Sequence, residues 1–346
     1  MEIKTQEIQI VDAPQIPGLT FRAFRDEEDY PEMFEIFKAT MDADGIEVGY
    51  TLEEMIIDYQ HLERCDPYTD MLFAEINGEP IAFGRCWWDS EPNGIHRYRF
   101  FVNILPEYRE TGIWEVMADT LIQRLKEISA DHPKYVTKYL QGWARDKQKW
   151  QQGMLEALGL KVIRYGFEMV RPCSQPMDVH PLPEGLEVRP ATPDQYRQIW
   201  EAAMEAFRDH WGFVEPTEKN YQNWLEFPYT QPELWKVAWD GDQVVGMVLN
   251  FINHDENQKY NRLRGYTEDI SVRRPWRRQG VARALLTQSI QMFIDMGMDE
   301  TDLAVDAENP NGALKLYKSV GYEPFRTSMI YRKPLFETKP NGRHEK

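Results

Sequence analysis

Residues 268–286, EDISVRRPWRRQGVARALL, contain the pattern that decides the fold of the second half of the chain. The segment that ends at Val272 predicts a strand, and a basic turn with a glycine at Gly280 follows it. Apolar residues then recur with spacings of four, four and three, the period of an amphipathic helix, at Ala282, Leu286, Ile290 and Phe293. Strand, glycine turn and helix in this order predict the start of a βαβ crossover in a mixed α/β sheet.

The turn before this helix is suited to bind an anion. Backbone N–H groups at a helix start converge on one point, where the partial positive charge of the helix N-terminus adds to them. Gly280 lets a ligand approach the backbone closely, and small Ala282 leaves space beside it. Five arginines surround the turn in an acidic chain, namely Arg273, Arg274, Arg277, Arg278 and Arg283. We therefore predict a pyrophosphate site, with a capped helix bearing a solvated basic face as the alternative.

A second segment, residues 303–322, supports the pyrophosphate site. It reads LAVDAENPNGALKLYKSVGY, which predicts a strand, an asparagine-containing turn, a short helix and a glycine stop. The turn at 277–282, Asn309, the Ala-x-x-x-Tyr helix with Tyr317 and the Gly-Tyr ending together resemble the GNAT superfamily of acetyl-CoA-dependent N-acetyltransferases. The resemblance covers roughly residues 185–334.

This resemblance implies acetyl-CoA as the acyl-donor cosubstrate and no metal. Backbone N–H groups would hold the pyrophosphate within a turn formed by Arg277, Arg278, Gln279, Gly280, Val281 and Ala282. Backbone groups of Ile270 and Val272 would pair with the pantetheine arm, and Asn309 would bind near the thioester. One extra residue precedes Ala313 relative to the commoner pattern, so Asn311 is expected to share the role of Asn309.

The resemblance also implies two catalytic roles. Tyr317 would protonate the departing thiolate, and a carboxylate on the preceding strand would take the proton of the amine. Glu268 and Asp269 are the candidates for this base. Adjacent strand residues face opposite ways, so at most one of them points into the cleft, and we prefer Glu268. The alternative for Tyr317 is a half-buried aromatic residue at a helix–sheet contact.

The chain repeats its organisation once. Residues 18–22, GLTFR, are echoed by residues 185–189, GLEVR, and the predicted hairpin at 73–84 is echoed at 237–246. A proline-rich segment at 171–183 lies between the copies. We predict two tandem GNAT-like domains of class α/β, each a mixed, mostly antiparallel sheet flanked by helices with a central βαβ unit. The predicted parts are 1–172, a linker at 173–184, 185–335 and a polar tail at 336–346.

The first copy lacks the residues that the second copy offers to a cofactor. Its turn, Arg109-Glu110-Thr111-Gly112-Ile113-Trp114, keeps the frame but places an indole where a small residue leaves room for phosphate. Glu110 adds a negative charge there, and Leu155 stands where the second copy has Tyr317. We predict that residues 1–172 do not bind coenzyme A. One working and one degenerate copy is an organisation similar to that of mycothiol synthase and related tandem GNAT proteins.

Composition limits the partners of the chain. A net charge of −17 argues against nucleic acid and is compatible with a cationic substrate. No apolar stretch approaches the ~20 residues that span a bilayer, so we expect a cytoplasmic protein without a membrane partner. The 3 cysteines are scattered without ligand spacing, which predicts neither a disulfide framework nor a metal site.

These observations together predict transfer of an acetyl group from acetyl-CoA to a primary amine, within a ternary complex. A small-molecule amine is expected rather than a protein. The alternative is a non-catalytic acyl-CoA-binding or regulatory module. The sequence carries no signal for an oligomeric state.

Overall fold

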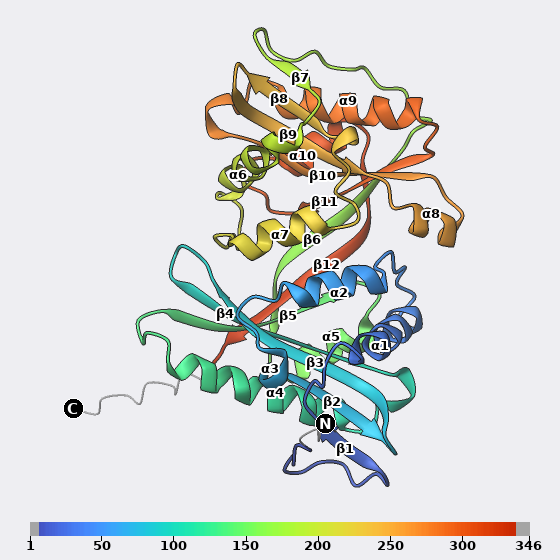
Figure 1. Cartoon of the computed structure of the whole chain (residues 1–346), viewed down its shortest axis with the longest axis vertical. Helices are drawn as coiled ribbons and strands as arrows, with labels where there is room; N and C mark the ends of the chain where they lie inside the picture. The colour runs from blue at the N-terminus through green and yellow to red at the C-terminus, as the bar shows by residue number, and fades with distance from the viewer. Residues whose placement is uncertain (1–6, 337–346) are drawn as a thin grey trace, which may run out of the picture. The chain divides into compact units, whose positions relative to one another are not determined.

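The computed structural model describes residues 7–336, which form two compact units (Figure 1). Unit 1 contains the chain up to Ile163 and the part from Met329 onward. Unit 2 runs from Arg164 to Ser328. The polar tail predicted from residue 336 lies, apart from Phe336 itself, outside the described residues.

Unit 1 is a mixed sheet with helices on both faces. Its strands follow the order β1-β2-β3-β4-β5-β12. Strands β4 and β5 pair in parallel on either side of the crossover helix α4, and β1 to β4 pair antiparallel. Its elements before the first shared strand are β1 (Leu19–Arg22), α1 (Asp29–Ala43), α2 (Leu52–Gln60), α3 (Pro67–Asp70), β2 (Met71–Ile76), β3 (Glu79–Ser90), β4 (Ile95–Ile104), α4 (Ile113–Ala130), β5 (Thr137–Arg145) and α5 (Lys149–Ala157).

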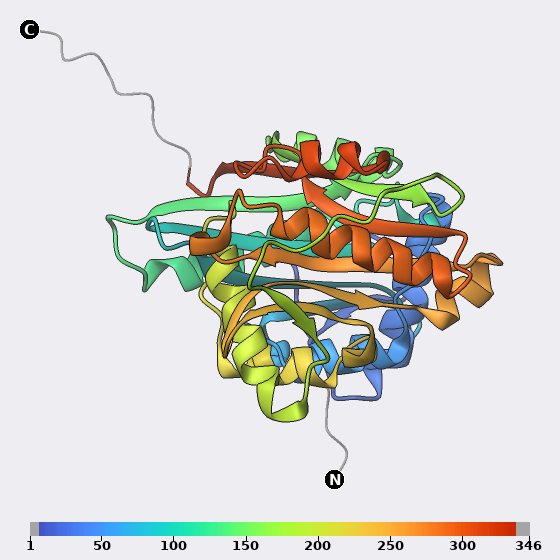
Figure 2. The same cartoon turned by 90° about the horizontal axis from the view of Figure 1, so that it is seen from above.

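Unit 2 repeats this arrangement in the order β6-β11-β10-β9-β8-β7. Strands β10 and β11 are parallel neighbours joined by α9, and the other pairs in this order are antiparallel. Its own elements are β7 (Glu187–Arg189), α6 (Tyr196–Phe207), α7 (Glu218–Glu226), β8 (Lys236–Asp240), β9 (Gln243–Phe251), α8 (His254–Tyr260), β10 (Arg264–Val272), α9 (Val281–Asp295), β11 (Glu300–Asp306) and α10 (Ala313–Ser319). Helix α9 packs along these strands (Figure 2). Both predicted crossovers are thus present.

Two long strands run from one unit into the other. Strand β6 (Lys161–Pro172) begins in unit 1 and ends in unit 2, whereas β12 (Glu323–Pro334) begins in unit 2 and ends in unit 1. The units therefore divide inside strands, at Ile163 and at Ser328, and not at residues 173–184. That proline-rich segment belongs to unit 2, because the buried guanidinium of Arg171 donates hydrogen bonds to its carbonyl groups and to that of Val320.

Each sheet buries apolar side chains on both faces. In unit 1, Phe73 and Phe83 pack under α1 and α2, and Trp114 of α4 is fully buried on the opposite face. In unit 2, Met247 packs under α6, and Leu285 of α9 covers the other face. Across residues 7–336, no helix combines the length and apolar character needed to cross a bilayer.

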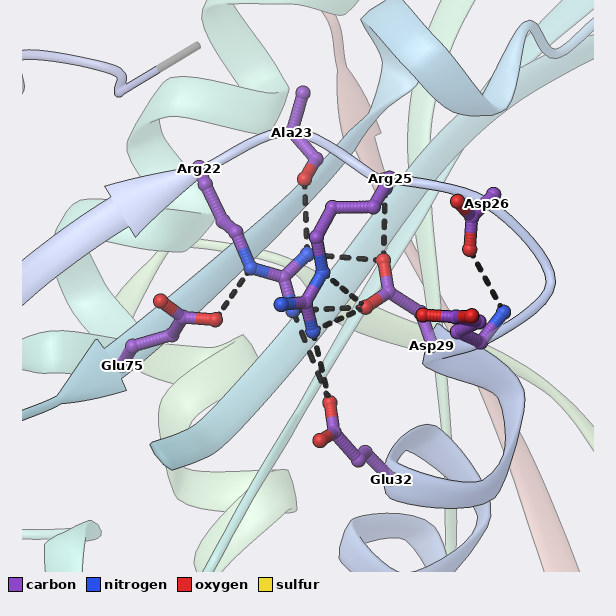
Figure 3. Close-up of polar contacts among 8 residues, drawn as sticks. Arg22, Ala23, Arg25, Asp26, Asp29, Glu32 and Glu75 are labelled. Atoms are coloured by element: carbon purple, nitrogen blue, oxygen red, sulfur yellow. Dashed lines mark hydrogen bonds and ion pairs between the residues drawn. The ribbon is translucent and has the colours of Figure 1, made fainter. Parts of the chain in front are cut away.

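A buried ion-pair cluster joins β1 to α1 in unit 1 (Figure 3). Asp29, the first residue of α1, is 0% exposed and accepts two hydrogen bonds of 2.9 Å from Arg22. Its carboxylate also accepts from the backbone N–H and the side chain of Arg25. Arg22 also pairs with Glu75 on β2. The negative charge of Asp29 interacts favourably with the partial positive charge at the start of α1. Its ion pair with Arg22 attaches this helix start to β1.

Candidate active site

A cavity of about 480 Å³ lies within unit 2 along the second half of β10. Its walls come from residues 270–272 of β10, from the start of α9 at 280–283, and from the turn that leads into α10 at 309–313. The cavity thus brings together the three segments that the sequence nominated for the cofactor.

The start of α9 offers uncapped donors to this cavity. Gly280 is its N-cap residue, with a left-handed φ of 92°, and no side chain of the described residues caps the helix. The first turn of a helix leaves its N–H groups without intrahelical partners, so those of Val281 and Ala282 remain available for an anion. A residue with a side chain would be strained at this φ, which explains the glycine.

Arg277 lines the cavity, but its guanidinium is engaged by the protein. It donates to the Val272 carbonyl at 2.8 Å, to Asp209 at 2.6 Å and to the Ala206 carbonyl at 2.9 Å. These bonds hold the turn against the end of α6. Hydrogen bonds from Arg274 and Arg277 also hold the pKa of the Asp209 carboxyl well below its usual range. Arg277 is therefore placed to position the turn.

Two other arginines also line this cavity. Arg278 is exposed and has a left-handed φ of 62°. Arg283 lines the cavity while donating to the Ser319 hydroxyl at 2.7 Å. The side-chain amide of Gln279 instead donates to the Pro275 carbonyl at 3.0 Å, and this residue does not line the cavity.

Strand β10 contains a β-bulge beside the candidate bases. Glu268 pairs with Leu249 and Ser271 pairs with Met247, so two residues of β10 lie opposite one residue of β9. Asp269, at the bulge, has a φ of 47°. A bulge interrupts the alternation of side chains and redirects the backbone. The simple parity argument between Glu268 and Asp269 therefore does not apply at this point of the strand.

Burial raises the pKa values of both carboxyl groups at this bulge, and neighbouring charges add to the effect at Glu268. Burial first, and then the charges of Asp269 and Asp302, raise the pKa of Glu268 to about 8. Burial raises the pKa of Asp269 to about 6. A carboxyl group with a pKa near the working pH can accept a proton from an amine with little penalty.

Tyr317 lies in the core beneath the site. Its side chain is 5% exposed and packs with Leu286 and Ile290 of α9, and it is not among the residues that line the cavity. Burial, followed by the charge of Glu268, raises the pKa of the Tyr317 hydroxyl above its ordinary value. The structure thus brings Tyr317 and Glu268 into one electrostatic environment.

The two asparagines lie together at the cavity. The side-chain oxygen of Asn309 accepts the backbone N–H of Asn311 at 2.9 Å, and both residues line the cavity before α10. Across residues 7–336 there is no group of three or more side chains that could hold a metal ion.

Sequence reasoning missed the contribution of the segment after α6. His210 lines the cavity, and burial lowers the pKa of its imidazole. Asp209, its neighbour, fixes Arg277 across a sequence separation of 68 residues. Unit 1 pairs Asp44 with Arg109 in the same way, a relation that only the structure shows.

Comparisons with known proteins agree with this site. The acetyltransferase (GNAT) family profile matches residues 196–322, which contain the whole cavity. A mycothiol acetyltransferase from Streptomyces bingchenggensis is 28% identical over 200 residues, which cover 56% of this chain and 63% of that protein. A probable N-acetyltransferase, san, from Drosophila melanogaster is 31% identical over 152 residues, which cover 43% of this chain and 74% of that protein.

The fold has a solved counterpart over nearly the whole chain. A GCN5-related N-acetyltransferase from Sphaerobacter thermophilus has a TM-score of 0.67 and 23% identity, covering 94% of this chain and 97% of that one. The sequence matches thus agree with what the structure shows, which is two units of mixed sheet and a helix start that is open to an anion. The chain belongs to the GNAT family of acetyltransferases.

Proposed function

We propose that unit 2 transfers an acetyl group from acetyl-CoA to a primary amine of a small molecule, by direct attack within a ternary complex. The observation that carries this proposal is the cavity that joins an uncapped helix start to residues 270–272 of β10; Glu268 and Asp269, at the adjoining bulge, do not themselves line it. The N–H groups of residues 279–282 would hold the pyrophosphate, with Arg278 and Arg283 supplying charge. Ile270 and Val272 would pair with the pantetheine arm.

The chemistry needs one proton acceptor and one proton donor. Glu268 would take the proton of the attacking amine as the new C–N bond forms, with Asp269 as the second candidate. Tyr317 would donate its hydroxyl proton to the thiolate as the C–S bond breaks, and Asn309 with Asn311 would orient the thioester. The raised pKa of Glu268 and its influence on Tyr317 support these roles.

A cationic small molecule is the acceptor class that we favour. Asp269, Asp302 and Glu168 act electrostatically on Glu268; Asp302 pairs with Arg264 and Glu168 with Arg326, so Asp269 is the carboxylate that would attract a charged amine before it loses its proton. The relative from Streptomyces, named a mycothiol acetyltransferase, supports a small-molecule acceptor rather than a protein.

Calorimetric titration of acetyl-CoA into Gly280→Glu, with Gly112→Glu as a matched control, tests where the cofactor binds. Both glycines precede a helix and have left-handed φ values, of 92° and 80°. We expect one site per chain in the wild type, lost in Gly280→Glu and retained in Gly112→Glu, because only the first variant places a carboxylate at the proposed phosphate position. Loss in Gly112→Glu alone would assign the site to unit 1 and contradict the proposal.

The second candidate function is a non-catalytic acyl-CoA-binding module. It would retain the acetyl-CoA site and show no acetyl transfer to any member of an amine library. Transfer that depends on Glu268 would exclude it.

A further inference from the structure

Unit 1 contains a second cavity, separate from the acetyl-CoA site proposed above. It has a volume of about 430 Å³ and lies between helices α1 and α2 and strands β3, β4 and β5. Aromatic side chains form much of its wall, among them Tyr50, Tyr59, Phe83, Trp87, Phe101 and Trp143. A concave wall that combines aromatic rings with charged and amide groups can hold and orient a small molecule.

Arg85 of β3 brings a cation into this aromatic wall. Its Nε and Nη1 atoms are shielded from solvent and have no hydrogen-bond partner among residues 7–336. The guanidinium carbon lies 4.9 Å from the ring centroids of Tyr59 and Trp87 and 5.5 Å from that of Phe101. The rings hold the guanidinium in place, but they do not accept its N–H groups as an oxygen would.

The other charged groups of the cavity wall already have partners. Arg109 donates two hydrogen bonds, of 2.8 and 3.1 Å, to Asp44. Arg99 donates to Asp89 at 3.3 Å, and Asp58 accepts the Tyr50 hydroxyl at 2.7 Å. The Nε of Arg109 is also unpaired, but among the three arginines of the wall Arg85 is the one that donates no hydrogen bond to a described residue.

Unit 2 indicates that the fold does not require this charge. Gly84 pairs with Val102 in unit 1, and Gly246 pairs with Val272 in unit 2, so the next residue along each strand is equivalent. That residue is Arg85 in unit 1, and in unit 2 it is the fully buried Met247. An apolar side chain therefore fits the equivalent position of the sheet, and packing alone does not explain why unit 1 has a guanidinium there.

We propose that unit 1 binds a small, planar, aromatic monocarboxylate in this cavity, with the carboxylate on Arg85 and the ring among the aromatic side chains. Two neighbouring N–H groups of a guanidinium match the two oxygens of a carboxylate. Three arginines and two aspartates line the cavity, an excess of one positive charge that suits a monoanion better than a phosphate dianion. The site does not depend on the function proposed for unit 2.

Titration of benzoate and indole-3-acetate into the full-length protein tests this proposal, with calorimetry and tryptophan fluorescence as readouts. Trp87, Trp143 and Trp150 line the cavity and would report its occupation. Benzyl alcohol and benzylamine are the neutral and cationic controls. We expect a carboxylate to bind at least tenfold more tightly than either control, with no loss of binding in Gly280→Glu. Failure of both carboxylates to bind at millimolar concentration would overturn the proposal.

Arg85→Met is the decisive variant, because Met247 shows that methionine fits the equivalent position. We expect it to fold with an unchanged or higher melting temperature and to bind the carboxylate at least tenfold more weakly. Arg85→Lys keeps the positive charge but lacks the two parallel N–H donors of a guanidinium. Its affinity for the carboxylate should therefore lie between those of the wild type and Arg85→Met. Undiminished binding in a folded Arg85→Met protein would refute the site. Equally, displacement of benzoate by inorganic phosphate or acetyl-CoA at lower concentration, in an Arg85-dependent manner, would assign the cavity to a phosphate ligand instead.

Discussion

Strand β9 pairs with β10 in unit 2 as β3 pairs with β4 in unit 1, and each pair has an equivalent glycine, yet the two pairs differ where a substrate would lie. A Cβ atom on Gly246 would come within 2.6 Å of the Ser271 carbonyl oxygen, and one on Gly84 within 2.7 Å of that of Phe101. Both units therefore need glycine there. Beyond it, unit 2 has a bulge and unit 1 has a regular ladder.

The bulge lies beside a position that carries opposite charges in the two units. Glu268 pairs with Leu249 in unit 2, and its counterpart by register is Arg99, which pairs with Trp87 in unit 1. The candidate base is thus replaced by a cation, and the redirected backbone near Asp269 has no equivalent. The two units thus share the close approach of paired strands at a glycine and differ in the charged side chain further along the strand.

The turns before α4 and α9 likewise share one set of contacts and differ in another. Arg109 pairs with Asp44 and donates to the Thr40 carbonyl, as Arg277 pairs with Asp209 and donates to that of Ala206. These arginines therefore support the turn in both units.

One hydrogen bond at these turns does differ between the units. The Val272 carbonyl accepts the Nε of Arg277 at 2.8 Å, whereas the Val102 carbonyl accepts the indole N–H of Trp114 at 3.3 Å. The Nε of Arg109 is consequently buried without a partner among the described residues. Trp114 has taken its acceptor and filled the space beside it.

Glu268→Gln should give the largest effect, since it removes the group that distinguishes β10 from β4. We expect kcat to fall by about 100-fold or more, with acetyl-CoA affinity unchanged, because a glutamine cannot accept the amine proton. The wild-type rate should rise with pH through about 8, since Glu268 accepts a proton only after losing its own and its pKa is raised to about 8. The variant should lack this rise in a steady-state pH profile. Arg99→Gln is the control in unit 1 and should keep kcat; an equal loss in both variants would contradict the assignment.

Trp114→Ala should have the next largest effect, and on stability rather than catalysis. The indole is fully buried, so its removal should lower the free energy of unfolding by about 3–5 kcal/mol, measured by denaturant titration. Trp143→Ala, which removes an indole that is 43% exposed, should cost far less. We expect no second acetyl-CoA site in Trp114→Ala, because β4 still lacks the bulge; a stoichiometry of two would show that the indole alone closes unit 1.

The sequence predicts the parts of this architecture that have local signals. Alternating apolar residues, turn glycines and helical spacing predict the hairpins, the crossovers and the start of α9. The exchange of β12 into unit 1 has no such signal, because a strand does not encode which distant edge it will join. The bulge at Asp269 is equally hidden, since no glycine or asparagine marks its positive φ. Arg85 becomes conspicuous only when the register places it against Met247.

We expect the smallest effects from Asp209→Asn and Asp44→Asn. Comparing them tests whether the turn arginine only stabilises the turn in both units or also supports cofactor binding in unit 2. Each change weakens the pair that holds one turn arginine, and we expect each to lower the free energy of unfolding by roughly 1–3 kcal/mol. For Asp209 the loss has a pH dependence: its carboxyl pKa is held below its usual range, so the wild-type advantage is present at neutral pH and disappears as the pH falls below about 4. Only Asp209→Asn should also weaken acetyl-CoA binding, severalfold by calorimetry, because the start of α9 lines the proposed cofactor cavity, whereas the start of α4 does not line the cavity of unit 1. Equal weakening of acetyl-CoA binding by Asp44→Asn would mean that the turn of unit 1 also supports a cofactor. Unit 1 would then contain a second site, which Trp114 closes in this structure.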